Sequence, residues 1–263
     1  MDLTTFDAVL LDLDGTIWHE HAPLPGAVDL VRQLQQRGQT FGFVSNSGAS
    51  PARVVHLLAA MGLQVDEATI LTAAGAACDY VLETFGAGCR VFNAGNDTVD
   101  ELLAGRVTLV EPDDAAGCQA VVIASLHHER AAAPRLQAAL RHLLRGAQLV
   151  AMCNDRYFPT PRGVEIGSGG VAALLSYAAA VTPVFCGKPE AWFFLDLCRR
   201  LRVDPSRCVL IGDNLESDVA GARRVGIRTI LPLTGVTDRP AAAAAAADRR
   251  PDWVIDDLRT LLR

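Results

Sequence analysis

Short runs of consecutive apolar residues alternate along this chain with longer segments in which apolar residues recur at helical spacing. The run DAVLLDL at 7–13 predicts a buried strand, because its central residues are all apolar. The segment at 25–38 predicts a helix, in which Val28, Val31 and Leu34 share one face between an opening proline and a closing glycine.

The alternation of strand and helix continues towards both ends of the chain. It predicts strands at 40–45, 183–187, 207–213 and 227–233, and helices at 50–62, 189–201 and 216–226. Strands that alternate with helices of this length are typical of βαβ units, so we expect a parallel sheet covered by helices on both faces.

Residues 76–180 carry an alternation of their own. Strands are expected at 89–95, 106–112, 119–125 and 148–154, and helices near 97–104, 130–145 and 169–180. The chain is therefore predicted to be an α/β protein: a Rossmann-like parallel-sheet core built from 1–75 and 181–263, with a smaller α/β cap domain at 76–180 inserted into it. The alanine run at 241–247 predicts a solvent-facing helix or a loop, and we assign it no function.

Composition narrows the possible functions. The 263 residues carry a formal net charge of −6, which makes the chain a poor candidate for binding nucleic-acid polymers or membrane surfaces. No apolar run is long enough to cross a bilayer, and the N-terminal sequence lacks a secretory signal pattern, so a cytoplasmic protein is expected. The seven cysteines form no C-x-x-C pair and are expected to be buried free thiols.

Lysine is almost absent from the chain. Among 24 lysines and arginines, Lys188 is the single lysine, in the stretch VFCGKPE. A chain that uses arginine for its ordinary solvated cations would keep a lysine where a site requires a compact ammonium group. From composition alone, chance explains a single lysine as well as a functional requirement does.

Two carboxylates follow the first predicted strand. Asp12 and Asp14 stand in the stretch DLDGT, where the glycine allows a turn that fans the two side chains apart. Aspartate is one of the groups that form covalent phospho-intermediates, and a neighbouring carboxyl group can act as general acid and base. An ordinary Asp-Gly turn would explain Asp14 but not Asp12, which is costly to bury unpaired.

Groups suited to an anion follow two other predicted strands. Ser45 and Asn46, in FVSNSG, place a hydroxyl and backbone N–H groups before a helix, although both residue types are also common in turns. Lys188 is held at the entrance of a helix that Pro189 begins, where its ammonium group can approach a phosphate as a point charge.

Hard oxygen ligands follow a fourth predicted strand, in GDNLESD. Asp213 ends this strand, Asp218 lies five residues further on, and together with Asp12 they indicate a Mg²⁺ site. A helix start that favours acidic residues accounts for Asp218 but poorly for Asp213. The four clusters together supply a nucleophile, an acid/base group, a cation and a metal site, which is the set that phosphoryl transfer requires.

The motifs DLDGT, SNSG, GKP and GDNLESD, in this order, resemble those of the haloacid dehalogenase-like (HAD) phosphatases. The segments PLPGA, LTGVT and PDWVIDDL, and the long insertion between the second and third motifs, resemble the NagD-like and 4-nitrophenylphosphatase-like subfamily with a type C2 cap. This resemblance covers nearly the whole chain. It implies the HAD fold and a Mg²⁺-dependent phosphomonoesterase that hydrolyses a small phosphorylated metabolite through an aspartyl-phosphate intermediate. Members of this subfamily often pair as homodimers through the cap, and the sequence leaves the subunit number of this chain open.

The resemblance implies roles for the residues around the phosphoryl group. Asp12 would be the nucleophile, and Asp14 would protonate the leaving oxygen and later activate water. Ser45 and Lys188 would hold the transferring group, aided by the backbone of Asn46.

The resemblance also implies a metal site. Mg²⁺ would be bound by Asp12, the backbone carbonyl of Asp14, and Asp213. Asp218 and Asn214 would support these ligands from behind, although Asn214 stands at a position where the family varies.

The cap sequence departs from that subfamily. The segment 153–170 lacks an Asn-Pro-Asp that the subfamily often carries, and SLHHE at 125–129 stands where many members have Asp-Arg. Both regions bear on substrate choice, so no substrate is carried over. The candidates for contact with the leaving group are Asn154, Asp155, Arg156 and Tyr157, with an ordinary polar loop as the alternative. His127 and His128 are interpreted as solvated loop residues.

Two other classes of function compete with the phosphatase. A catalytically weak phosphate-binding or regulatory protein would not need a nucleophile together with an acid/base pair, so Asp12 and Asp14 favour the enzyme. A nucleotide-dependent dehydrogenase is excluded, because no G-x-G-x-x-G motif follows the first predicted strand.

Overall fold

The computed structural model describes residues 2–126, 132–160 and 163–262. These residues form two compact units. The first unit comprises Met1–Ser45, Pro51–Leu71 and Lys188–Arg263, and the second comprises Asn46–Ser50 and Thr72–Gly187. The domain boundaries expected from the sequence, after residues 75 and 180, stay a prediction about independently folding parts.

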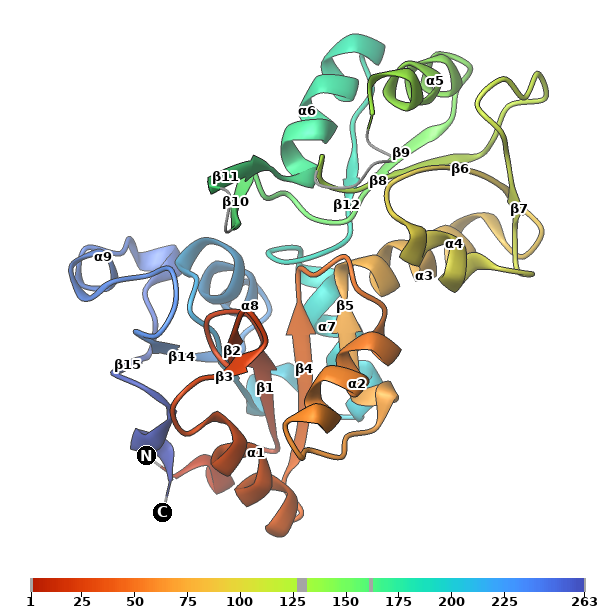
Figure 1. Ribbon diagram of the computed structural model, residues 1–263. Coiled ribbons are helices and arrows are strands. Elements are labelled where there is room, and N and C mark those ends of the chain that lie inside the picture. The colour runs from red at the N-terminus through yellow and green to blue at the C-terminus, as the bar shows by residue number, and fades with distance from the viewer. Residues whose placement is uncertain (1, 127–131, 161–162, 263) are drawn as a thin grey trace. The chain divides into compact units, whose positions relative to one another are not determined.

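The first unit is built on a six-stranded sheet with the order β15–β14–β13–β1–β4–β5 (Figure 1). Its strands are β1 (Ala8–Asp12), β4 (Thr40–Ser45), β5 (Ile70–Thr72), β13 (Cys208–Ile211), β14 (Arg228–Pro232) and β15 (Trp253–Ile255). The pairs from β15 through to β4 are parallel, as the strand–helix alternation predicts.

Helices connect these strands, and a small hairpin follows the first of them. The helices are α1 (Ala27–Gln36), α2 (Pro51–Ala60), α7 (Ala191–Leu201), α8 (Ala220–Arg224) and α9 (Arg239–Ala243), and the hairpin is β2 (Trp18–His19) with β3 (Ala22–Pro23). The alanine run thus contains the end of α9. Its residue Ala242 packs with Val219 and Leu231, while most of the run is exposed.

Apolar patterning explains the core of the first unit. Every residue of β1 is buried, which agrees with a central strand covered on both faces. In α1 the buried stripe is Ala27, Leu30, Val31 and Leu34, so Val28, expected on this face, lies at its half-exposed border instead.

The second unit contains a five-stranded parallel sheet with the order β12–β9–β8–β6–β7 (Figure 1). Its strands are β6 (Arg90–Ala94), β7 (Thr108–Leu109), β8 (Ala120–Ile123), β9 (Gln148–Ala151) and β12 (Val184–Phe185). Its helices are α3 (Ala73–Phe85), α4 (Asp97–Leu103), α5 (Ala133–Leu144) and α6 (Ser168–Ala179). An antiparallel hairpin pairs β10 (Tyr157–Thr160) with β11 (Gly163–Ile166).

One strand belongs to a different sheet from the one expected. The segment 183–187 was grouped with the core strands, but β12 pairs in parallel with β9 of the second unit. The place beside β4 in the first sheet is taken by β5, a three-residue strand too short for the apolar pattern to reveal.

The sequence also predicts buried free cysteines and no apolar run long enough to cross a bilayer. All seven cysteines are free, and all but the half-exposed Cys118 are buried. None of the described helices is both long and apolar enough to span a membrane. His127 and His128 lie outside the described residues.

Candidate active site

The candidate site lies at the carboxyl ends of two central strands of the first unit. Asp12 is the last residue of β1, and Asp213 follows the end of β13, whose Ile211 is the partner of Leu11. The chain runs from β1 to β4 on one side and returns to β13 on the other, so the topology reverses at this edge. In open parallel sheets such a reversal opens a crevice where ligands bind.

Lys188 joins two of the aspartates. Its Nζ lies 2.5 Å from Oδ1 of Asp12 and 2.7 Å from Oδ1 of Asp218. All three residues are buried, with Lys188 only 3% exposed. The hydroxyl of Thr16 donates to the other oxygen of Asp12, Oδ2, at 3.2 Å. The nucleophile candidate therefore has both carboxylate oxygens fixed by neighbours.

Asp213 is fixed by the loop that follows β14. The backbone N–H of Val236 donates to Oδ2 of Asp213 at 2.6 Å. Two glycines leave room for this carboxylate: a Cβ on Gly15 would lie 2.5 Å from Oδ2, and one on Gly235 would lie 1.9 Å from it. Gly15 also has a φ of +84°, which other residues rarely adopt. The glycines of DLDGT and LTGVT are thus explained by close approach to Asp213.

Asp218 lies in a π-helical turn, Leu215–Val219, that precedes α8. The backbone N–H of Asn214 donates to Oδ2 of Asp218 at 3.2 Å. The side-chain oxygen of Asn214 accepts from the N–H groups of Glu216 and Ser217 and so caps this turn. Asn214 therefore fixes the backbone that presents Asp218, while its predicted support of a metal site stays a prediction.

Burial sets the electrostatics of this cluster. It raises the pKa of Asp12 to about 7 and that of Asp218 to about 7, against the attraction of Lys188 in both cases. It also raises the pKa of Asp213 to about 6, and the charge of Asp218 adds to this rise. Burial alone would lower the pKa of Lys188, but the carboxylates of Asp12 and Asp218 raise it above its ordinary value. The ammonium group is therefore charged at neutral pH.

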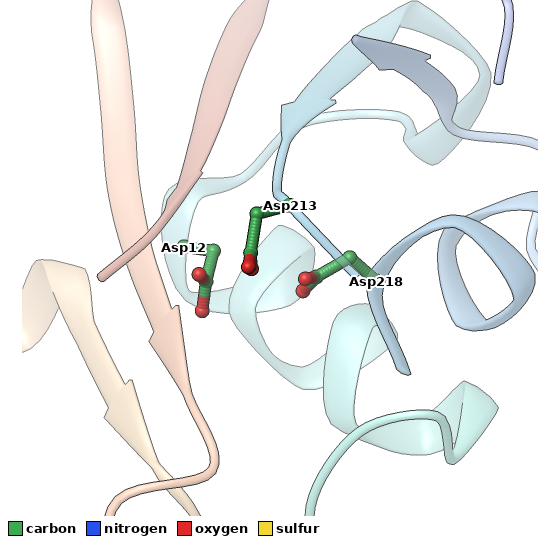
Figure 2. Close-up of side chains that lie close together, drawn as sticks. All are labelled: Asp12, Asp213 and Asp218. Atoms are coloured by element: carbon green, nitrogen blue, oxygen red, sulfur yellow. The ribbon is translucent and has the colours of Figure 1, made fainter. Parts of the chain in front are cut away.

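The donor set fits a divalent cation. Asp12, Asp213 and Asp218 each offer a carboxylate oxygen within 4.8 Å of the others, and Figure 2 shows the three side chains turned towards one another. Three carboxylates against the one ammonium of Lys188 leave an excess of two negative charges (3 − 1) when all are ionised. Buried oxygen ligands with excess negative charge are what Mg²⁺ or Ca²⁺ requires.

Asp14 differs from the other aspartates because it is exposed. Its side chain does not join the buried cluster of carboxylates; instead its Oδ1 accepts a hydrogen bond from the indole Nε1 of Trp18 at 2.8 Å. The glycine turn has thus directed Asp12 and Asp14 to different surroundings, as the DLDGT pattern predicts.

Ser45 ends β4 in the first unit and is buried, whereas Asn46 begins the short segment that groups with the second unit. In the second unit, Nδ2 of Asn46 donates to Oδ2 of Asp155 at 3.0 Å. Asp155 is half-buried, and the three other candidates of the cap loop are exposed: Asn154, Arg156 and Tyr157. Their roles toward a substrate stay predictions.

Comparisons with known proteins identify the family. A haloacid dehalogenase-like hydrolase model matches residues 9–106, and a HAD-hydrolase-like model matches residues 185–261. Haloacid dehalogenase-like hydrolase domain-containing protein 2 from Rattus norvegicus is 32% identical over 229 residues, which cover 87% of this chain and 84% of that protein. The chain belongs to the haloacid dehalogenase-like hydrolase family.

Solved structures of HAD proteins share its fold. The p-nitrophenyl phosphatase from Archaeoglobus fulgidus is 28% identical and superposes with a TM-score of 0.89, covering 98% of both chains. The glycerol phosphate phosphatase from Mycobacterium tuberculosis, solved in complex with magnesium, is 28% identical with a TM-score of 0.85, covering 99% of this chain and 78% of that one. The α/β fold and the resemblance to HAD phosphatases are thereby confirmed.

The HAD motifs did not reveal every residue that shapes this site. Thr16, whose hydroxyl holds Asp12, is the last residue of the DLDGT motif, and Trp18, whose indole holds Asp14, follows that motif by two residues. Their positions in the sequence alone carry no signal of these contacts. Val236 holds Asp213 from a loop 23 residues away. Its segment, LTGVT, carries a signal only as part of the family resemblance, because a backbone N–H donor does not depend on the type of residue.

Proposed function

We propose that this HAD hydrolase is a Mg²⁺-dependent phosphomonoesterase that acts on a small phosphorylated metabolite through an aspartyl-phosphate on Asp12. The buried cluster of Asp12, Lys188, Asp213 and Asp218 is the observation that supports this most. Relatives named for p-nitrophenyl phosphate and glycerol phosphate hydrolysis favour the same class of reaction.

The first chemical step uses Asp12 and Asp14. A carboxylate oxygen of Asp12 attacks phosphorus as the bond to the leaving oxygen breaks, and Asp14 in its protonated form delivers its proton to that oxygen. In the second step Asp14 takes a proton from water, whose oxygen attacks phosphorus and releases phosphate from Asp12. Each proton that Asp14 gives is thus recovered in the following step.

Lys188 and a divalent ion held by the carboxylates would offset the negative charge of the phosphate and of Asp12. An anionic carboxylate and a phosphate dianion repel each other, and the ammonium group of Lys188 offsets part of this repulsion. Asp12, Asp213 and the backbone carbonyl of Asp14 would hold the divalent ion, and Asp218, whose carboxylate lies in the same buried cluster, would support these ligands. When bound, that ion supplies positive charge at the phosphoryl oxygens and orients them.

The Asp12→Asn variant tests the proposal. We expect turnover of p-nitrophenyl phosphate to fall by at least about 10³-fold, because a carboxamide is a poor nucleophile. The protein should stay folded, since the carboxamide occupies the same volume. Asp29→Asn, a matched exchange at an exposed position of α1, should keep full activity. Undiminished turnover by Asp12→Asn would remove the nucleophile assignment.

The intermediate can be sought directly. An Asp14→Asn variant given p-nitrophenyl phosphate should form the phosphorylated protein but hydrolyse it slowly, because a carboxamide cannot activate water. Intact-mass spectrometry should then detect one added phosphoryl group, which the Asp12→Asn, Asp14→Asn double variant lacks. A panel of phosphometabolites with Mg²⁺, repeated with chelator, would address the substrate and the metal.

The cap candidates lend themselves to a comparison of substrates. If Arg156 meets the leaving group, Arg156→Ala should change the relative rates across the panel while the rate with p-nitrophenyl phosphate changes least. An identical substrate profile in the variant would show that Arg156, which is exposed, is an ordinary loop residue without a role in substrate choice.

A further inference from the structure

The carboxyl group of Asp14 is held by a side chain to which neither the family motifs nor the proposed chemistry gives a role. Nε1 of Trp18 donates to Oδ1 of Asp14 at 2.8 Å. Trp18 is only 2% exposed, whereas Asp14 is exposed. A buried donor therefore restrains a carboxyl group that would otherwise rotate freely in solvent.

The backbone fixes this donor relative to its acceptor. The N–H of Trp18 donates to the carbonyl of Leu13 at 3.0 Å, and the N–H of Gly15 donates to the carbonyl of Trp18 at 2.8 Å. Asp14 and Trp18 are thus bridged across a closed turn. On its other side Trp18 pairs with Pro23 in the β2–β3 hairpin, so the backbone that carries the indole is held from both directions.

We propose that Trp18 is a positioning residue for Asp14: its indole N–H holds Oδ1 and thereby presents Oδ2 to the leaving oxygen and, later, to water. This inference rests on the proposed function, in which Asp14 is the acid and base. General acid catalysis depends on hydrogen-bond geometry, so a freely rotating carboxyl group would protonate the leaving oxygen less often.

Two substrates with different leaving groups distinguish a positioning role of Trp18 from a purely structural one. p-Nitrophenolate is a stable anion that departs without a proton, whereas the alkoxide of glycerol phosphate must be protonated as it leaves. The ratio kcat/KM covers the events up to departure of this group and excludes hydrolysis of the intermediate. Loss of positioning at Asp14 should therefore lower kcat/KM for glycerol phosphate much more than for p-nitrophenyl phosphate.

The test is the Trp18→Phe variant, which deletes the donor. We expect kcat/KM for glycerol phosphate to fall about tenfold further than kcat/KM for p-nitrophenyl phosphate, since small misplacements of a catalytic group cost roughly 10- to 100-fold. The matched control is Trp253→Phe, the same exchange in β15, where the indole packs on Phe6 and Arg228. That variant should leave the ratio of the two kcat/KM values unchanged.

A second variant separates the donor from the volume of the ring. Benzothienylalanine at position 18 keeps the shape of the indole but replaces its N–H with sulfur, so folding should be preserved even if Trp18→Phe unfolds. It should lower the same ratio. Equal losses for both substrates, or no loss, would overturn the role of Trp18.

The Asp14→Asn variant distinguishes failure of this inference from failure of the proposed function. Asp14→Asn should itself lower the glycerol phosphate to p-nitrophenyl phosphate ratio, and adding Trp18→Phe should lower it no further. If Asp14→Asn leaves the ratio unchanged, the acid role of Asp14 fails. If it lowers the ratio while the position-18 variants do not, only the inference about Trp18 fails.

Discussion

The two parallel sheets of this chain carry different polar side chains at the carboxyl ends of their strands. In the first unit, β1 and β13 lead into Asp12 and Asp213, which are buried with Lys188 and Asp218. In the second unit, the corresponding end of β6 carries a buried carboxamide, Asn93. Among the described residues, every buried aspartate and lysine belongs to the first unit.

The neutral strand end is fully paired within its own unit. Nδ2 of Asn93 donates to the carbonyl of Asn96 at 2.9 Å and to Oδ1 of Asp100 at 2.8 Å, and its Oδ1 accepts from Gly95 N–H at 2.8 Å. The charged cluster of the first unit instead keeps an excess of carboxylates. The two sheets thus differ at their strand ends: the paired carboxamide stabilises a turn, whereas the unbalanced carboxylate cluster has the donor set that suits a cation.

Among the experiments that test this contrast between the two units, replacing the single lysine of the charged strand ends is expected to have the largest effect. Lys188→Arg keeps the charge but introduces a wider, planar group into a site where Lys188 is 3% exposed. We expect kcat/KM with p-nitrophenyl phosphate to fall by about 10²–10³-fold, the usual cost of one misplaced electrostatic donor. The reverse exchange at an exposed ion pair, Arg207→Lys, should keep full activity. A fully active Lys188→Arg variant would mean that any cation suffices.

A charge placed at the neutral strand end should cost stability. Asn93→Asp removes both donated hydrogen bonds and sets a carboxylate beside Asp100. Urea unfolding should give a free energy of unfolding lower by about 2–4 kcal/mol. The mirror exchange, Asp12→Asn, should cost less in metal-free buffer, because it removes a carboxylate whose burial is itself unfavourable. Equal losses from the two exchanges would erase the contrast between the units.

Metal should stabilise only the charged strand ends. Added MgCl₂ should raise the melting temperature of the wild type, since a ligand at 100 times its Kd stabilises a fold by about 2.7 kcal/mol. Asp213→Asn should lose this increase, because one of the three clustered carboxylates is gone. Asn93→Asp should retain it, since its site lies in the second unit. An increase that survives in Asp213→Asn would place the ion elsewhere.

Much of this contrast could be predicted from the sequence, because apolar runs and the polar residues that end them are local signals. The run that ends in Asp12 and the one that precedes Asp213 both form strands of one parallel sheet, as the βαβ pattern predicts. That these two strands are neighbours does not follow from the pattern, because the chain forms β4, β5 and the whole second sheet between them. The partners of the site residues could not be predicted. Whether Trp18 reaches Asp14 depends on how the turn closes, and Val236 reaches Asp213 through a distant loop.

The membership of β12 shows the same limit at the level of the fold. A two-residue strand carries too little pattern to choose between two sheets, and its pairing with β9 is decided by tertiary packing. Lys188 follows this strand by three residues and returns to the first unit. The expected proximity of Lys188 to Asp12 is thus observed, but the strand that precedes Lys188 was assigned to the wrong sheet.

The smallest expected effect concerns how the free energy of unfolding depends on pH, which should have opposite signs for buried groups in the two units. His142 of α5 is 1% exposed, and neither ring nitrogen has a hydrogen-bond partner among the described residues. Its ring packs on Phe92, with 4.8 Å between the ring centroids. Burial lowers the pKa of His142, so the folded state binds its proton less readily than the unfolded state does.

Acid should therefore weaken the second unit. As the pH falls below the ordinary histidine pKa of 6.5, the unfolded chain takes up a proton that folded His142 refuses, and this contribution to stability is lost. The slope for one proton is at most about 1.4 kcal/mol per pH unit. Asp12, Asp213 and Asp218 act in the opposite direction without metal, because their raised pKa values favour folding at low pH. This contribution is lost as the pH rises from the ordinary value of 3.8 through the raised values of about 6 to 7.

Comparing His142→Phe with the wild type cancels the carboxylate contribution, which both proteins share. Urea unfolding at pH 7.5 and pH 5.5 should show the wild type losing more stability on acidification than His142→Phe does. His56→Gln, at an exposed position of α2, should follow the wild type. If His142→Phe also follows the wild type, the imidazole of His142 finds a way to accept its proton in the folded state. The second unit would then tolerate a buried charge, and the contrast with the charged strand ends of the first unit would rest on Asn93 alone.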